Sequence, residues 1–289
     1  MLTRPVPPWI AGVLGAGTVL LLSWLERRRP LRRSVEPKLR REARNLSVAG
    51  VSAVAIVLAE RPLVIPLALC VETQNWGLVR QFGLPAWLET AVALVLMDYA
   101  FYVWHVLMHR VPLLWRLHLV HHVDLDLDAS TALRFHFTEM LASIPWRAGQ
   151  VILIGLTPFS FSVWQCVFLL SILFHHSNVE LPIRLERWLN KFIVTPRMHG
   201  IHHSVVERET NTNWSSGLTI WDWLHGTLRL NVPQAEITIG VPAFQEPKAV
   251  TLPRVLAMPF EHLPPNWEFT TGGTPQPHRS EGPVTVLSP

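Results

Sequence analysis

Long apolar runs constrain this chain more than any other feature. Residues 9–25, 46–70 and 84–109 are each close to the length that an α-helix needs to cross a bilayer. The second run is interrupted by Glu-Arg-Pro at 60–62, so the sequence leaves open whether it crosses once with a bend or continues as an interfacial piece. Only 16% of the residues are charged and 49% are hydrophobic, which favours a membrane protein. We predict an all-α, polytopic membrane helical bundle.

The remaining apolar sequence and the basic residues predict a topology. Residues 137–157 and 159–174 are divided by Pro158, which predicts a helical hairpin that enters the membrane and returns to the same side. Residues 26–44 carry nine Lys and Arg against three Glu, which is typical of a cytoplasmic loop. A polyanion-binding arm is the alternative, but a basic segment beside an apolar helix argues against a nucleic-acid partner. This topology places every histidine cluster on the cytoplasmic face. We expect a bacterial inner membrane, or its eukaryotic equivalent, the endoplasmic reticulum.

Histidines gather at the ends of the apolar runs. His105 and His109 are four residues apart, and HxxHH motifs begin at His118 and His199. Residues spaced by three or four lie on one face of a helix. One histidine or one such pair is usually structural, so the repetition carries the argument. Neutral imidazoles need hydrogen-bond partners and protonated ones repel each other, whereas metal ions satisfy many imidazoles at once. About ten ligands are too many for one ion and suit two.

The types of ligand atom in the predicted site limit which metals and reactions it suits. The two cysteines, Cys70 and Cys166, lie in apolar runs and form no CxxC site, and the HExxH signature of zinc proteases is absent. A nitrogen-rich site for two ions beside a bilayer suits oxygen activation by iron and oxidation of a lipid C–H bond. One alternative is a metal transporter, although transporters usually place polar residues at the bilayer midplane. A non-catalytic metal-binding scaffold is the other alternative.

The residues from 98 to 139, then FHHSNVELP, TPRMHGIHHS and NWSSGLTIWDWLHGT, resemble the fatty acid hydroxylase / sterol desaturase superfamily over residues 98–230. The resemblance implies an O₂-dependent membrane enzyme that hydroxylates or desaturates a lipid such as a sterol, fatty acyl chain or sphingolipid. It also implies a histidine-bound dimetal centre, which we expect to hold two Fe per chain. The sequence has no flavin, haem or iron–sulfur motif, so we expect a separate electron donor of the ferredoxin or cytochrome b5 type. The implied metal ligands are His105, His109, His118, His121, His122, His136, His176, His199, His202 and His203.

The chain departs from the pattern of that superfamily at three positions. Val106 stands where HRxxH would place a basic residue, and His225 stands where phenylalanine is usual. We treat His225 as an accidental extra histidine. His175 lies beside a family position and is at best a spare ligand. We expect three regions: an N-terminal helix and basic loop (1–45), a catalytic membrane domain (46–230), and a cap with a disordered tail (231–289).

Carboxylates and one amide are candidates to support the ligands. Asp98 shares a helical stripe with His105, and a carboxylate in mid-span is costly, so we predict a hydrogen bond from a ligating imidazole to Asp98. Pairing with some other helix is the alternative. Glu139 lies one turn beyond His136 and is predicted to support it in the same way. We expect Asn178 to bond a ligand or fix a loop.

Three aspartates, Asp124, Asp126 and Asp128, alternate in a predicted loop. They lack the spacing of an EF-hand calcium site, so we predict a solvated turn.

Overall fold

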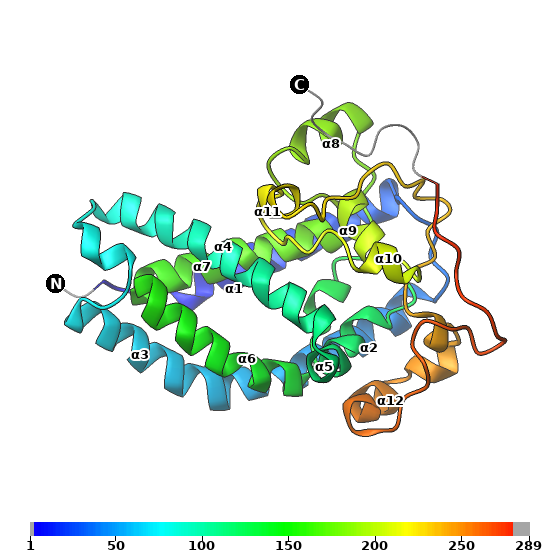
Figure 1. The fold of residues 1–289 in the computed structure, drawn as a ribbon, viewed down its shortest axis with the longest axis horizontal. Helices are drawn as coiled ribbons and strands as arrows, with labels where there is room; N and C mark the ends of the chain where they lie inside the picture. The colour runs from blue at the N-terminus through cyan, green and yellow to red at the C-terminus, as the bar shows by residue number, and fades with distance from the viewer. Residues whose placement is uncertain (1–2, 280–289) are drawn as a thin grey trace.

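The computed structural model describes residues 3–279, in which helices are joined by loops and the β-structure is limited to isolated bridges. The long helices lie lengthwise beside one another, and short helices gather at the end opposite the N-terminus (Figure 1). The predicted all-α membrane bundle is therefore confirmed. Four stretches are long and apolar enough to cross a membrane: α1 (Pro8–Arg28), Lys38–Phe82, α4 (Ala86–Arg110) and α7 (Pro158–His176).

The second of these stretches remains helical through residues 60–62. Pro62 has no N–H, and its ring would crowd the carbonyl four residues earlier in a regular α-helix. The chain avoids this conflict with a π-helical turn, in which the Arg61 N–H donates to the carbonyl of Ile56, five residues back. The stretch consists of α2 (Lys38–Ala55), the π-turn η1 (Ile56–Glu60), α3 (Arg61–Gln74) and a 3₁₀ turn (Val79–Phe82).

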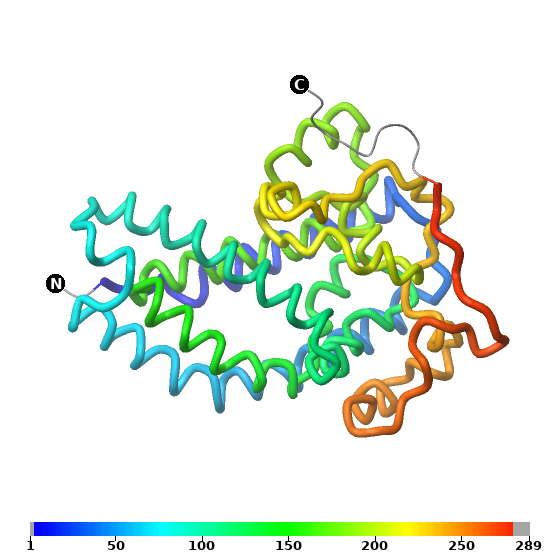
Figure 2. Tube along the Cα trace, viewed as in Figure 1, coloured from blue at the N-terminus to red at the C-terminus, as the bar shows by residue number. Residues whose placement is uncertain are grey.

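The predicted helical hairpin is present. It consists of α6 (Phe137–Gln150), a second π-turn, η4 (Val151–Gly155), and α7. Thr157 caps α7 by accepting a 3.1 Å hydrogen bond from the Ser160 N–H, which starts the helix directly after the turn. The first arm runs away from the short helices and α7 runs back to them (Figure 2).

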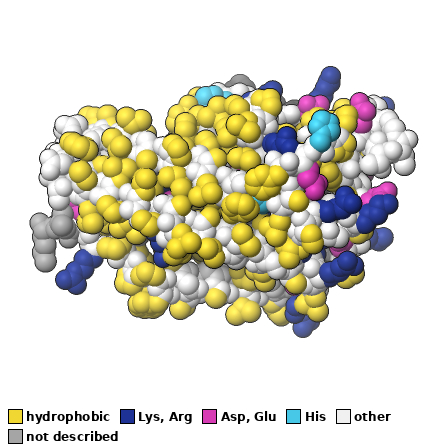
Figure 3. Space-filling model, turned by 90° about the horizontal axis from the view of Figure 1, so that it is seen from below, with side chains coloured by type: hydrophobic (Ala, Val, Ile, Leu, Met, Phe, Trp, Pro, Cys, Tyr) yellow, Lys and Arg dark blue, Asp and Glu magenta, His cyan; other side chains and the backbone are white. Residues whose placement is uncertain are grey.

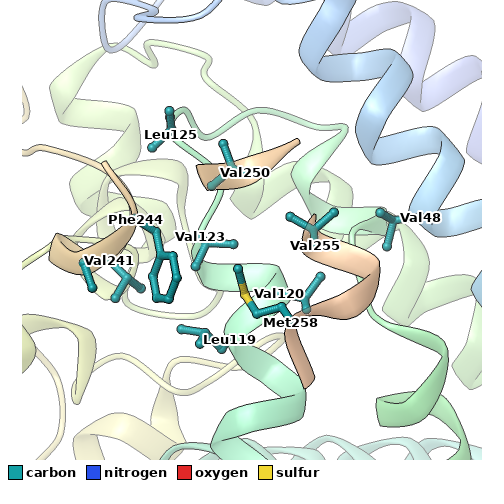
Figure 4. Close-up of a cluster of buried hydrophobic side chains, with 11 residues drawn as sticks. Val48, Leu119, Val120, Val123, Leu125, Val241, Phe244, Val250, Val255 and Met258 are labelled. Atoms are coloured by element: carbon teal, nitrogen blue, oxygen red, sulfur yellow. The ribbon is translucent and has the colours of Figure 1, made fainter. Parts of the chain in front are cut away.

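The C-terminal region covers the end of the bundle. Its apolar side chains pack on Leu119 and Val120 of α5 (Pro112–His122), with Val48 of α2 at the border of the same cluster (Figure 4). His278 bonds the carboxylate of Glu209 at 2.9 Å, which fastens the end of the described chain. Residues 280–289 of the predicted disordered tail lie outside the described residues. The short helices are α5 (Pro112–His122), α8 (Ile183–Leu189), α9 (Pro196–His202), α10 (Glu207–Thr210), α11 (Ile220–Leu224) and α12 (Leu252–Ala257).

The predicted solvated turn at Asp124, Asp126 and Asp128 is instead buried. Arg41 of α2 donates to Asp124 at 2.9 Å and to Asp128, and Arg44 donates to Asp124 at 3.2 Å. Burial alone would raise the pKa of Asp124, but the neighbouring guanidinium groups, Arg41 foremost, lower this pKa to about 2. Asp124 is therefore a paired anion, and its contacts with Arg41 and Arg44 join α2 to the loop after α5.

The basic segment explains why the turn was predicted wrongly. Its predicted loop covered residues 26–44, but α1 continues to Arg28 and α2 begins at Lys38. Two of the arginines assigned to the loop thus lie on the first turns of α2 and point into the protein. Their partners are distant in sequence, and no local pattern links the two segments.

The surface over the long helices is apolar. Hydrophobic side chains cover this part of the molecule, whereas most acidic and basic side chains gather at the capped end (Figure 3). Leu20, Leu58 and Leu153 are each more than 70% exposed. Such a broad apolar surface needs a lipid environment, so the protein is an integral membrane protein.

Candidate metal centre

Eight of the predicted ligands form two groups of four. Within each group, one ring nitrogen from every histidine lies within 4.8 Å of the other three. Metal–imidazole bonds are about 2.1 Å long, so nitrogens on opposite sides of one ion lie about 4 Å apart. Each group therefore has the size of one coordination shell. The first group is His105 and His109 of α4, His122 of α5 and His202 of α9; the second is His121, His176, His199 and His203.

The two adjacent histidine pairs are divided between the groups. His121 and His122 belong to different groups, and so do His202 and His203. Consecutive side chains on an α-helix point about 100° apart, and the ring planes in each pair lie at 84° to each other. The sequence pattern suggested one face for each HxxHH motif. The structure shows that each motif serves two neighbouring positions.

His118 lies between the groups. One of its nitrogens is within 4.8 Å of donor atoms of His121 and His122, and its Nδ1 lies 3.1 Å from a carboxylate oxygen of Glu139. Glu139 thus supports His118, not His136 as the sequence had suggested. Its charge holds the imidazole with Nδ1 protonated, which directs the Nε2 lone pair towards the neighbouring histidines.

The structure does not bring His136 into either group. It is the N-cap of α6, where its Nδ1 accepts a 3.2 Å hydrogen bond from the Thr138 N–H. Its Nε2 donates to the carbonyl of Leu256 at 3.2 Å. Both ring nitrogens are occupied by the protein, so we leave His136 out of the proposed ligand set.

The nitrogens in the two groups need partners that the described residues do not provide. Both ring nitrogens of His122 and of His203 are buried without a hydrogen bond. One nitrogen in each of His109, His118 and His121 is in the same situation. An unmade hydrogen bond costs about 1–3 kcal/mol at each buried site. Metal ions relieve this cost at many lone pairs together, and an all-imidazole donor set fits Fe, Zn, Cu or Ni. The residues present therefore fit a pair of metal ions.

Backbone carbonyls fix the orientation of three rings. A carbonyl oxygen only accepts hydrogen bonds, so each ring nitrogen facing one must carry the proton. That nitrogen is Nδ1 in every case, which leaves the Nε2 lone pair free for a metal. The 2.8 Å pairs are His105 with Trp214, His202 with Thr212 and His176 with Ile172.

The sharpest convergence surrounds His176. Its Nε2 lies 3.1 Å from Nε2 of His121 and 3.0 Å from Nε2 of His199. Because the proton of His176 is on Nδ1, its Nε2 presents a lone pair to both neighbours. These three nitrogens would hold a metal ion together, which would account for their approach.

Burial keeps the imidazoles neutral. It lowers the pKa of His121, His122, His199 and His203 well below the usual value, and the neighbouring histidines lower it further. Burial also lowers the pKa of His202, to about 3. At neutral pH each of these rings is therefore uncharged and keeps one nitrogen lone pair that can bind a metal.

Asp98 does not receive the predicted hydrogen bond from an imidazole. Its Oδ2 accepts from the Leu218 N–H at 2.9 Å and from the Trp221 indole at 2.7 Å. Asp98 therefore ties α4 to the loop that also carries Trp214, whose carbonyl orients His105. Asp98 thus affects the orientation of His105 through the backbone of this loop, without touching the imidazole.

Asn178 fixes a loop, one of its two predicted roles. Its side chain accepts from the Arg32 N–H at 2.9 Å and donates to the Arg32 carbonyl at 2.8 Å. The two extra histidines stay outside both groups. His175 packs against His199 with ring centroids 4.1 Å apart, and His225 stacks on Tyr102 at 5.0 Å.

A cavity of about 470 Å³ leads to the histidines. Its walls are mainly apolar and come from α2, α4, α6 and α7. Its volume lies within the range of pockets that enclose small molecules. Histidines from both groups form one end of it, including His105, His121 and His176. A lipid chain or ring system in this cavity would therefore lie directly against the metal positions.

Replacing Glu139 by Gln should weaken metal retention about 10- to 100-fold, because His118 would lose the charge that orients it. The measurement is metal content after dialysis against increasing chelator. Glu246→Gln, at an exposed carboxylate, is the matched control and should retain metal like the parent. Equal retention in both variants would contradict this role for Glu139.

Comparison with known proteins agrees with this geometry. Residues 90–227 match the family model described as Fatty acid hydroxylase. An ornithine lipid hydroxylase of Rhizobium tropici is 34% identical over 159 residues, which are 54% of this chain and 46% of that protein. Human cholesterol 25-hydroxylase is 30% identical over 139 residues, covering 47% of this chain and 49% of its own length. Human alkylglycerol monooxygenase is 28% identical over 158 residues, 53% of this chain and 34% of that protein. The chain thus spans about half the length, or less, of these relatives. No solved structure matches it.

Proposed function

Because residues 90–227 match the model of the fatty acid hydroxylase family, we propose that this chain is a member of that family and an O₂-dependent di-iron oxygenase acting on a C–H bond of a membrane lipid. One observation carries this proposal: an apolar cavity between membrane-crossing helices ends at two groups of four histidines. Hydroxylation is the main reaction and desaturation the close variant. The relatives are named for ornithine lipid, cholesterol and alkylglycerol, which supports an amphiphilic lipid as the substrate class.

The two histidine groups would each hold one iron ion, with His118 beside both. When bound, the irons would supply O₂ reduction with two electrons from a separate donor of the ferredoxin or cytochrome b5 type. Hydroxylation then consumes the lipid, O₂, two electrons and two protons, and yields the alcohol and one water. Desaturation consumes the same reactants and yields a double bond and two waters.

The residues of the chain would position the lipid. The apolar walls of the cavity exclude water and hold the chain or ring against the histidine end. Phe135 stacks on His121, with ring centroids 4.7 Å apart, and so borders both the lipid space and a ligand. Glu139 and the backbone carbonyls keep the imidazoles in one orientation while the lipid enters. We assign no separate acid–base residue.

We place the protein in a bacterial inner membrane with the histidine groups facing the cytoplasm. The basic residues at the end of α1, Arg27 and Arg28, support this orientation, because positively charged residues flank cytoplasmic helix ends. The electron donor would then dock on the same face.

Metal analysis and product analysis test the proposal together. We expect two irons per chain in protein purified in detergent. We also expect lipids carrying one added oxygen, or lacking two hydrogens, when cells express the parent and not a ligand variant. Tight iron with no lipid product under any reductant would favour a non-catalytic scaffold. Labile zinc that moves across liposome membranes would favour a transporter. Either result would overturn the oxygenase.

A further inference from the structure

The cavity has a second polar end, distant from the histidines. Glu60, Arg147 and Gln165 line it there. Gln165 lies eleven residues before His176 on α7, which corresponds to about 16 Å of helix. Arg147 lies eight residues after Glu139 on α6, or about 12 Å. Charged groups thus sit deep among membrane-crossing helices.

These groups have few partners. Glu60 is only 8% exposed, and its carboxylate has no hydrogen bond or close ion pair to any described residue, although it is the charge that acts on Arg147. Arg147 donates to Gln150 at 2.8 Å and stacks on Trp164, with 4.3 Å to the ring centroid. Its Nε and the amide nitrogen of Gln150 are buried and have no hydrogen-bond partner among residues 3–279. Polar atoms in this state indicate a missing ligand, because each costs free energy until it is paired.

The backbone is irregular at the same place. Glu60 ends the π-turn η1, and the π-turn η4 begins directly after Gln150. Single π-turns inside α-helices occur frequently at functional sites. A second cavity, of about 220 Å³, is also lined by Glu60 and Gln165. The polar end therefore lies where two spaces meet, with room for a ligand on either side.

The opposite charges of Glu60 and Arg147 determine which chemical group of a lipid can bind at this end of the cavity. A carboxylate only accepts hydrogen bonds and a guanidinium only donates them. A hydroxyl does both, so it satisfies Glu60 and Arg147 together without adding charge. An anionic lipid end would meet the repulsion of Glu60, and a cationic end that of Arg147.

We propose that Glu60 and Arg147 form a subsite for the hydroxyl group of a neutral lipid alcohol. The inference rests on the proposed function, because it makes this contact the anchor of the substrate end that does not react. The length of cavity between the subsite and the histidines then sets which carbon of the lipid is oxidised. Specificity thus lies in residues remote from the metal ligands.

Equilibrium binding tests the subsite separately from turnover. The probes are radiolabelled 1-tetradecanol and tetradecane, bound to the metal-loaded protein in detergent. We expect the alcohol to bind roughly tenfold more tightly, the effect of hydrogen bonds to charged groups. The double variant Glu60→Leu/Arg147→Leu should lose this preference and stay folded, since it removes both charges together. Arg80→Leu/Glu89→Leu removes an ion pair that lines neither cavity and should keep the preference.

Single substitutions give a signature that a purely structural role would not produce. Glu60→Gln should shift selectivity towards myristate, because only the positive charge remains. Arg147→Gln should shift it towards tetradecylamine. Equal binding of alcohol and alkane by the parent, or an unchanged preference in the double variant, would overturn the subsite. An intact preference in protein that holds metal but oxidises no lipid would overturn the oxygenase and leave the subsite standing.

Discussion

Replacing His121 by Ala should empty at least one metal position and abolish lipid oxidation. His121 belongs to the second histidine group, and one of its ring nitrogens also lies within 4.8 Å of ring nitrogens of His118 and His122. Its loss removes a nitrogen 3.1 Å from Nε2 of His176, at the densest point of the centre. The effect should exceed the 10- to 100-fold loss typical of an outer partner such as Glu139. Iron per chain and oxidised lipid per cell are the two measurements.

His225→Ala is the matched control for this variant. His225 is a histidine in the family-matched segment, but it stacks on Tyr102 outside both groups. We expect it to retain both irons and the activity of the parent. Full metal content in His121→Ala, or equal loss in the two variants, would contradict the division of ligands described above.

Replacing Arg41 by Met should destabilise the folded protein by about 3–5 kcal/mol, because a buried ion network would lose its central cation. Arg41 donates to Asp124 and Asp128 and lies 3.7 Å from a carboxylate oxygen of Asp126. Methionine fills similar space but has no charge, so the buried carboxylates would lose the cation that offsets their desolvation. Thermal unfolding in detergent, together with the yield of folded protein, is the measurement.

Arg40→Met tests whether this loss is specific. Arg40 is the neighbour of Arg41 on α2 and is exposed, so its substitution should change stability by less than about 0.5 kcal/mol. Arg41→Lys should be intermediate, because it restores the charge without the forked donor geometry. Similar unfolding of the Arg40 and Arg41 variants would show that the network adds little.

Local sequence patterns predicted those features of the fold that depend on neighbouring residues. Run length predicted the long helices, and Pro158 predicted the hairpin, because both depend on neighbouring residues. The histidine spacing predicted the elements that carry the centre. It did not show that His121 and His122 join different groups, since this depends on where α9 and α7 lie around α5.

Partners distant in the sequence could not be predicted. Glu139 is near His136 along the chain, yet in space it contacts His118. Asp98 lies on the same stripe as His105, but the loop after α10 reaches it first. In the sequence, Glu60 and Arg61 interrupt an apolar run. This interruption was the one sign in the sequence that a charged group lies at the far end of the cavity. The sequence alone did not show that Arg147 faces it.

The division of adjacent histidines has a thermodynamic consequence for assembly. The end of α5 carries His121 and His122, one in each histidine group, and His202 and His203 at the end of α9 are divided in the same way. If both groups bind metal as proposed, the first ion to arrive would immobilise backbone that the second ion also uses. Much of the ordering entropy would then be lost once, which favours binding of the second ion. Metal uptake should accordingly be cooperative, with apoprotein and doubly loaded protein coexisting and little of the singly loaded form between them.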